Sequence, residues 1–374
     1  MMSVSMRALL TCPFIPVVPR LASHRSAQGI IYADQIRQTG EYDRVDVNWG
    51  GEAVTDHNDY DVVYVYFGSD WTGGLNLFGG IKAFPYAWNI RNFSKFKGKV
   101  YSLAIDFPNI DEMIAERIRI GQSKNAEIQP EWLEVDIENL ARMRRESTTV
   151  RFPYITDKIV IGDSHSICMH RPGWTVNSVP FKTLNGALNT GLKTFIEEVR
   201  PIEEVASLEC YFGNIDVRHH LCRIEGDPLE NARKLAIRYV DGVVALPIEK
   251  KAIYELLPIE NESRKLPQTG YHKGKPFWGS WSVRESVRRE FNATCEGLCR
   301  DHDVEFIRWT NYLLNSAGEL DFKFMEKPHS IHLSREFYPH WNGSEHFQVP
   351  SRKSNKSRQN GKPVVAESSL LAFF

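Results

Sequence analysis

Short apolar runs, many of them β-branched or aromatic, alternate along the chain with longer amphipathic segments. In the first part of the chain such runs occupy 62–68 and 100–106, and an opening strand fits the apolar stretch 8–18. Runs of this length that end at glycine or a polar turn are typical of buried strands. Helical periodicity with mixed charges follows at 110–120. The pattern predicts a small α/β domain over residues 1–150.

A polar, basic stretch at 143–151 separates this domain from a second one. Further strands are predicted at 158–161, 175–179, 205–212, 252–257 and 304–307. Helices are predicted at 192–199, 230–240 and 282–301, the last with Ser282 as its N-cap and Glu285 three residues on. Strands that alternate with helices predict a parallel sheet covered on both faces. We therefore expect an α/β domain at 155–345 and a mobile polar tail at 346–374.

The composition is that of a globular protein and excludes collagenous, coiled-coil and wholly disordered chains. Of the 374 residues, 42% are hydrophobic and 25% charged, and the formal net charge is -1. This balance gives no overall attraction to nucleic acid or an anionic membrane. No stretch approaches the roughly 20 apolar residues of a membrane span. We expect a cytoplasmic protein; the alternative is export, because Arg7 precedes the first apolar run and Ala22 and Ser23 follow it.

Cysteine and histidine spacing does not predict a metal or a cofactor. Six cysteines are too sparse for a disulfide scaffold, and Cys295 and Cys299 share one helix face as small apolar side chains. His219 and His220 are adjacent, so they point in different directions on a strand or a helix. No acidic residues have the spacing of a known metal motif. We expect neither a metal ion nor a cofactor.

Three segments carry residues suited to acyl chemistry. A strand ends in Gly162-Asp163-Ser164, a second ends in a glycine turn within 209–221, and a late histidine lies within 328–334. Open α/β sheets place their chemistry at the carboxyl ends of the strands. A serine hydroxyl becomes a good nucleophile when an imidazole takes its proton, and the developing oxyanion then needs N–H donors.

The order and spacing of these segments resemble the SGNH/GDSL hydrolase superfamily over about 155–340, half of the chain. The resemblance implies a three-layer, flavodoxin-like α/β/α fold with Ser164 as nucleophile in the first block. It implies that His332, in the fifth block, is the general base. The N–H groups of Ser164 and Gly186 and the amide of Asn214 would hold the oxyanion.

Two positions depart from the family's pattern. An ungapped match puts Ile215 where the family has its oxyanion asparagine, so Asn214 serves only if the turn shifts by one residue. His329 occupies the position of the aspartate that orients the catalytic histidine, a role in which a carboxylate also stabilises the imidazolium. Either the enzyme acts as a Ser–His dyad, or another acid supplies the charge: Asp321, Glu326 or Asp216.

Two functions fit these residues. In the first, an esterase or acyltransferase uses Ser164 and His332, with Asp163 and His329 beside them, on an ester of a carbohydrate or nucleotide conjugate. In the second, a binding or group-transfer protein keeps the fold without serine chemistry and binds a sugar, a nucleotide or a modified nucleic acid. The oligomeric state does not follow from the sequence.

Four further residues are candidates for substrate binding. They are Asp216, Arg218 and His219 in the third segment, and Trp71 in the glycine- and aromatic-rich loop 69–80. A guanidinium suits carboxylate or phosphate groups. Structural interpretations compete with these: Asp163 as a helix cap, Asp216 and Arg218 as an ion pair, and Trp71 as loop packing.

Overall fold

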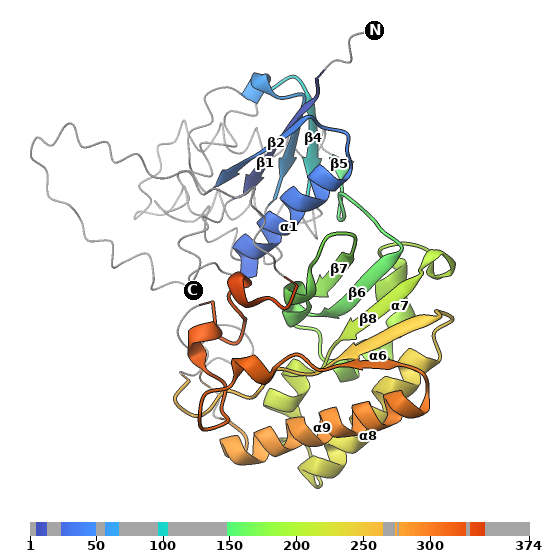
Figure 1. Ribbon diagram of the computed structural model, residues 1–374, viewed down its shortest axis with the longest axis vertical. Coiled ribbons are helices and arrows are strands. Elements are labelled where there is room, and N and C mark those ends of the chain that lie inside the picture. The colour runs from blue at the N-terminus through green and yellow to red at the C-terminus, as the bar shows by residue number, and fades with distance from the viewer. Residues whose placement is uncertain are drawn as a thin grey trace, which may run out of the picture. The chain divides into compact units, whose positions relative to one another are not determined.

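The computed structural model describes residues 5–12, 24–49, 57–66, 96–103, 148–264, 274, 277–326 and 330–340. Within these residues it contains two five-stranded sheets in which all neighbouring strands run parallel (Figure 1). The predicted helix at 110–120, the aromatic loop with Trp71 and the C-terminal tail lie outside the described residues.

The first sheet has the strand order β2-β1-β3-β4-β5. Its strands are β1 (Arg7–Cys12), β2 (Arg44–Trp49), β3 (Val62–Val65), β4 (Lys99–Ser102) and β5 (Thr148–Thr149). Helix α1 (His24–Gln38) connects β1 to β2. The opening strand and the two apolar runs are confirmed as β1, β3 and β4, whereas α1 and β2 were not predicted.

The second sheet has the strand order β10-β9-β8-β6-β7. Its strands are β6 (Lys158–Asp163), β7 (Thr175–Val179), β8 (Ser207–Tyr211), β9 (Lys250–Tyr254) and β10 (Glu305–Ile307). Counted from its own first strand, this order is 2-1-3-4-5, the flavodoxin-like arrangement. The first sheet has the same order. The predicted α/β class and flavodoxin-like fold are confirmed by this topology.

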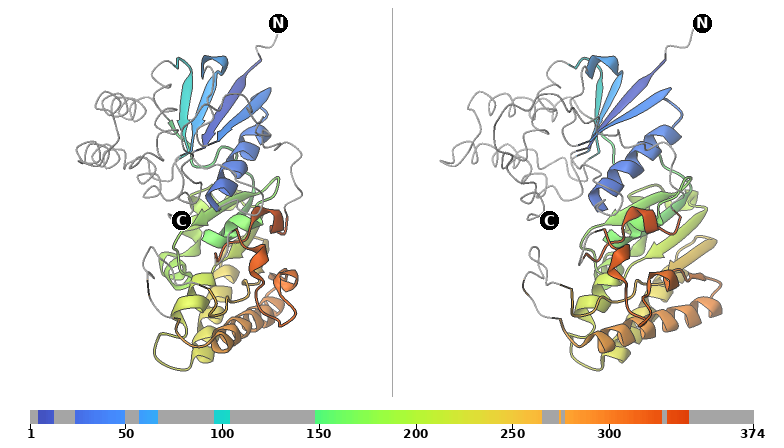
Figure 2. Two further views of the ribbon diagram at one scale, coloured as in Figure 1. Left: turned by 90° about the vertical axis from the view of Figure 1, so that its left-hand side faces the viewer. Right: turned by 60° about the vertical axis from the view of Figure 1, so that its left-hand side comes forward.

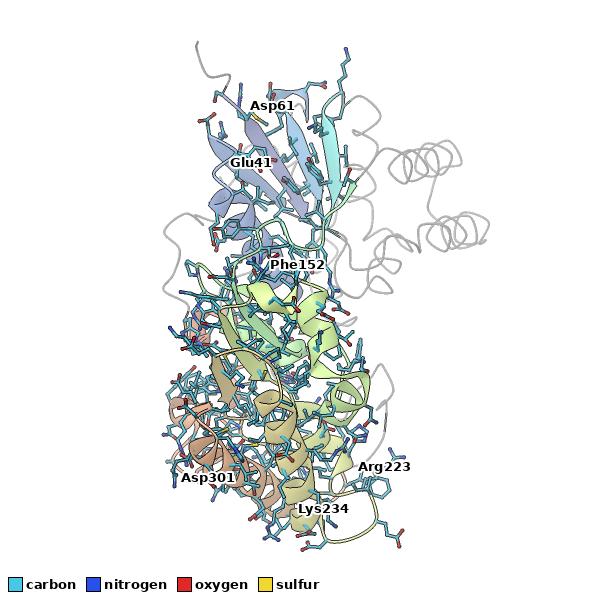
Figure 3. All side chains as sticks on the ribbon, turned by 90° about the vertical axis from the view of Figure 1, so that its right-hand side faces the viewer. Glu41, Asp61, Phe152, Arg223, Lys234 and Asp301 are labelled. Atoms are coloured by element: carbon cyan, nitrogen blue, oxygen red, sulfur yellow. The ribbon has the colours of Figure 1, made fainter. Side chains whose placement is uncertain are left out.

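Helices cover one face of the second sheet. They are α6 (Leu184–Thr190), α7 (Leu192–Glu197), α8 (Pro228–Val244) and α9 (Trp281–Asp301). Figure 2 shows α8 and α9 side by side, and Tyr239 of α8 stacks on Phe291 of α9 with ring centroids 6.3 Å apart. Their outer surfaces carry charged residues such as Lys234 and Asp301 (Figure 3). This division into apolar and charged faces is what an amphipathic helix requires.

The predicted N-cap of α9 is wrong by two residues. Ser280, not Ser282, has the extended backbone of a cap, and its side chain accepts a hydrogen bond from the Val283 N–H. The predicted capping box therefore does not form, because Ser282 already lies inside the helix.

Short 3₁₀ turns and irregular chain cover the other face of this sheet. Turn η6 (Ser164–Met169) follows β6 directly, and three more turns follow β10: η9 (Asn311–Leu313), η10 (Phe322–Phe324) and η11 (Arg335–Phe337). The Trp309 ring packs against Tyr211 of β8 with centroids 6.0 Å apart. This return of the chain carries His332 to the sheet.

Candidate active site

Ser164 lies where β6 ends and η6 begins. The tight junction requires the preceding glycine, because a Cβ atom on Gly162 would lie 2.5 Å from the carbonyl oxygen of Tyr211. Asp163 then caps η6, since its side chain accepts a hydrogen bond from the His165 N–H at 2.9 Å. Strand, glycine and cap together fix the position of the Ser164 backbone.

The structure brings Ser164 and His332 together across 168 residues of sequence. The Oγ atom of Ser164 and the Nε2 atom of His332 are 3.0 Å apart, a distance suited to proton transfer. The His332 N–H donates to Ser330 Oγ at 3.1 Å, and the His332 carbonyl accepts from the Glu326 N–H at 2.9 Å. An antiparallel bridge between Met325 and Leu333 closes this turn and holds the imidazole in place.

Glu326 places a carboxylate beside the other nitrogen of this imidazole. Its Oε1 atom lies 3.8 Å from His332 Nδ1 and accepts a hydrogen bond from Ser330 Oγ at 2.9 Å, and the residue is 6% exposed. The other two acids considered from the sequence are engaged elsewhere. Asp321 pairs with Lys323 at 2.8 Å, and Asp216 accepts backbone N–H groups of α6. His329 lies outside the described residues.

Asp163 connects His165 and Asn214 through hydrogen bonds. Its Oδ1 accepts from the backbone N–H and the Nδ1 of His165, and its Oδ2 accepts from the N–H and the amide of Asn214, both at 3.3 Å. Burial alone would raise the pKa of Asp163, but the contacts with His165 and Asn214 hold the pKa below its usual value. Asp163 thus faces His165 rather than His332, as expected for the cap interpretation.

His165 is buried against His332, with ring centroids 4.8 Å apart. Burial lowers the pKa of His165 to about 4, although the nearby Asp163 carboxylate opposes this shift. The neutral ring donates from Nδ1 to Asp163 and leaves Nε2 to accept from Arg218 Nη1 at 3.4 Å, a tautomer assigned from these partners. The sequence indicated no such role for His165; only its place after Ser164 could have suggested one.

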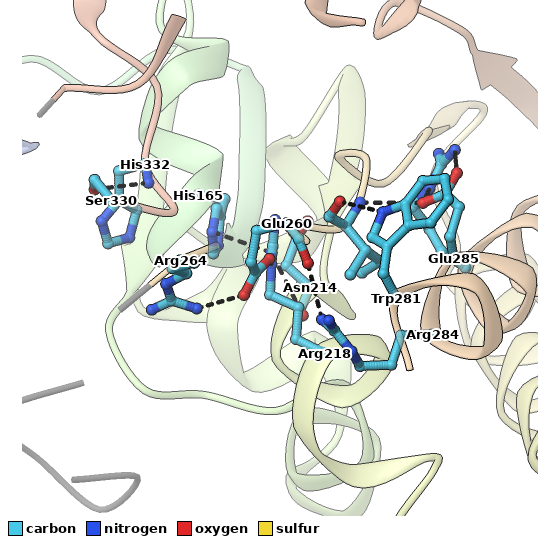
Figure 4. A network of polar contacts seen from close by, with 12 residues as sticks. His165, Asn214, Arg218, Glu260, Arg264, Trp281, Arg284, Glu285, Ser330 and His332 are labelled. Atoms are coloured by element: carbon cyan, nitrogen blue, oxygen red, sulfur yellow. Dashed lines mark hydrogen bonds and ion pairs between the residues drawn. The ribbon is translucent and has the colours of Figure 1, made fainter. Parts of the chain in front are cut away.

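Arg218 lies inside the domain, which corrects its predicted role as a residue that contacts substrate. It is 2% exposed and sits on the π-helical turn η8 (Asp216–His220). Its Nε donates to Glu260 Oε2 at 2.8 Å, and Arg264 pairs with the other carboxylate oxygen (Figure 4). The two guanidinium groups overcome the effect of burial and lower the pKa of Glu260 to about 2. Glu260 was not predicted.

Asp216 and Gly186 both belong to the N-terminal cap of α6. Asp216 accepts hydrogen bonds from Leu184 N at 2.6 Å and Asn185 N at 3.3 Å. The Gly186 N–H donates to the cap residue Thr183 at 3.0 Å. Gly186 therefore does not present its N–H to an oxyanion, and Asp216, 2% exposed, is not placed to bind substrate. Burial raises the pKa of Asp216 to about 6, despite these N–H donors.

The remaining predicted residues are placed as follows. Asn214 is completely buried; its amide donates to Asp163, and its Oδ1 accepts from Tyr211 OH at 3.5 Å. His219 is half-buried on η8. Among the described residues, no group of three His, Cys, Asp or Glu side chains could hold a metal ion, and no helix is long and apolar enough to cross a membrane. Trp71 lies outside the part that the structure describes.

No family model and no curated protein matches the chain. A putative acylhydrolase from Bacteroides fragilis is similar over 48% of this chain and 79% of its own, at 12% identity and a TM-score of 0.35. An extracellular lipase from Streptomyces rimosus is similar over 50% of this chain and 95% of its own, at 13% identity and a TM-score of 0.28. A gut microbial diltiazem-metabolizing enzyme is similar over 42% of this chain and 38% of its own, at 13% identity and a TM-score of 0.28. TM-scores this low assign the chain to no family.

Proposed function

We propose that this protein is a serine esterase or acyltransferase that cleaves an ester or acyl bond. The contact between Ser164 Oγ and His332 Nε2, at 3.0 Å on the sheet edge, supports this proposal. A part-buried serine–histidine contact, with a carboxylate 3.8 Å from the other imidazole nitrogen, is an arrangement that can activate a hydroxyl. The substrate class, an ester of a carbohydrate or nucleotide conjugate, is part of the proposal.

In the proposed reaction His332 takes the Ser164 proton as the hydroxyl oxygen attacks the acyl carbonyl carbon. The imidazolium then gives this proton to the leaving alcohol as the C–O bond breaks, and the acyl group stays on Ser164. Water, or a second hydroxyl group, releases it in the reverse sequence. The proposed oxyanion donor is the Ser164 N–H, because Asn214 is completely buried and donates to Asp163.

A fluorophosphonate probe tests this proposal, because it forms a covalent bond only with an activated serine. We expect the protein to be labelled at Ser164, and Ser164→Ala to abolish labelling while the far-ultraviolet circular dichroism stays unchanged. Ser286→Ala, on the exposed side of α9, is the matched control and should label like the parent. A folded protein that is never labelled would exclude the serine mechanism.

Glu326→Gln tests whether this carboxylate replaces the family's missing aspartate. Loss of the charge 3.8 Å from His332 Nδ1 should lower kcat by roughly 10- to 100-fold with little change in KM. We expect less than the loss of about 10⁴-fold known for a directly hydrogen-bonded aspartate, because 3.8 Å is too long for a hydrogen bond. Asp321→Asn, which removes an acid paired with Lys323, should leave both constants unchanged. Equal kinetics for both variants would indicate a Ser–His dyad.

The second candidate function is a ligand-binding or group-transfer protein without serine chemistry. The engagement of Gly186 N–H by Thr183, and of Asn214 by Asp163, favours it, because these were two of the three predicted oxyanion donors. Absence of probe labelling, together with binding of a sugar or nucleotide to the folded protein, would support this function instead.

A further inference from the structure

A strained turn follows β7, the strand that pairs with β6. The Lys182 N–H donates to the carbonyl of Val179 at 3.4 Å, and Pro180 and Phe181 are the two central residues. Phe181 has φ +60, in the left-handed region. Proline second and a positive-φ residue third are typical of a type II turn, which favours glycine or asparagine at the third position. A phenylalanine there costs stability, since its Cβ crowds the following carbonyl.

Phe181 is also the most exposed of the large hydrophobic residues in the described ranges. Its side chain and backbone together are 78% exposed, compared with 51% for Ile224 and 45% for Tyr312. Exposed apolar surface contributes nothing to folding. A glycine would remove the strain and the exposed ring together, so neither local conformation nor packing explains why an aromatic residue occupies this position.

The turn and Ser164 both follow the carboxyl ends of paired parallel strands, β7 and β6. Val179, its first residue, pairs with Asp163 in the β6–β7 register. Ser178 reinforces this pairing, because its hydroxyl donates to the Asp163 carbonyl at 3.1 Å. Ser164 follows Asp163, and Phe181 comes two residues after Val179. Two adjacent parallel strands therefore end just before Ser164 and Phe181, so both residues follow the carboxyl edge of the sheet.

We propose that Phe181 binds the apolar part of the acyl group that Ser164 attacks. This inference rests on the proposed function and narrows its substrates to esters of medium-chain or aromatic acids, in preference to acetyl esters. Contact between the ring and the acyl chain removes apolar surface of both from water. The turn holds the backbone of this residue in one conformation, so less conformational freedom is lost when the acyl group binds.

Phe181→Gly separates recognition from stability. We expect its melting temperature to equal or exceed that of the parent, because the strain is relieved. Its kcat/KM for a 4-nitrophenyl hexanoate should fall by roughly 10-fold or more, while kcat/KM for the acetate changes less than about twofold. Phe181→Tyr should keep the preference for hexanoate. Trp278→Ala, which removes another exposed aromatic ring, should leave both rates unchanged.

A binding measurement keeps this inference separate from the serine chemistry. In a Ser164→Ala background, N-butyl hexanamide should bind, and adding Phe181→Gly should weaken its Kd by roughly 10-fold in calorimetry. If the hexanoate-to-acetate ratio and the Kd are both unchanged by Phe181→Gly, the inference is wrong and the proposed function stands. If the parent hydrolyses no ester and is not labelled, the proposed function fails. The inference that Phe181 binds an acyl chain is then judged by whether Phe181→Gly weakens the Kd for the hexanamide. Absence of any hexanamide binding overturns the inference.

Discussion

Ser164→Ala and His332→Ala should each lower kcat/KM for an activated ester by at least about 10⁴-fold, and the double variant should lose little more. The hydroxyl and the imidazole act as one unit, because the serine is a poor nucleophile until the histidine takes its proton. Removing either group therefore removes the same step. The 3.0 Å contact between Oγ and Nε2 is the geometric basis of this expectation.

The measurement is steady-state hydrolysis of the same ester by the two single variants and the double variant, with thermal unfolding as a check on folding. His302→Ala, at the exposed C-terminal cap of α9, is the matched histidine control and should keep full activity. Additive losses would mean that the two side chains contribute independently. Full activity in Ser164→Ala would exclude this serine as the nucleophile.

The second sheet was predictable because its strands are short apolar runs in a regular alternation with helices. The predicted strand at 175–179 coincides with β7, and the run before Gly162 is β6. In the first sheet, α1 was missed because Gly29 and the buried Gln35 interrupt its apolar stripe. Strand β2 was missed although its sequence, RVDVNW, alternates polar and apolar residues as a half-buried strand does, because the prediction relied on continuous apolar runs.

The site was less predictable, because its contacts join residues far apart in sequence. The resemblance to the SGNH/GDSL superfamily brought Ser164 and His332 into one hypothesis, but nothing local relates Arg218 to Glu260, forty-two residues later. The sequence already contained a signal against Gly186 as an oxyanion donor. A threonine three residues before it is a helix-cap pattern, and Thr183 indeed accepts the Gly186 N–H.

Arg218→Met should destabilise the protein by about 3–5 kcal/mol, because it leaves the buried Glu260 carboxylate with one fewer cation. The Arg218 and Glu260 side chains are 1% and 0% exposed, so water cannot replace the lost partner. Arg284 does not compensate, since its Nη1 donates to the backbone carbonyl of Glu260 at 3.0 Å rather than to the carboxylate. His165 also loses the donor to its Nε2, so labelling of Ser164 should slow even where the variant is folded.

Urea denaturation at pH 7 measures the loss, and Arg233→Met provides the control. Arg233 pairs with Glu290 on the helix surface at 2.6 Å but is 43% exposed, so its removal should barely shift the urea midpoint. The double variant Arg218→Met with Glu260→Met should be less destabilised than the sum of the single variants, because neither member of the pair is then left buried without the other. A strictly additive result would show that the pair does not interact in the folded protein.

The pH dependence of stability gives an independent test of the same cluster. Because the folded pKa of Glu260 is about 2 and its ordinary value is 4.5, its contribution is complete above about pH 4.5. It is lost as the pH falls from there toward 2, since the unfolded chain takes up the proton first. Glu260→Gln should therefore flatten the unfolding free energy over this acid range relative to the parent. If Glu260→Gln leaves the pH dependence of the unfolding free energy unchanged over this range, the Glu260 carboxylate is not stabilised by Arg218 and Arg264.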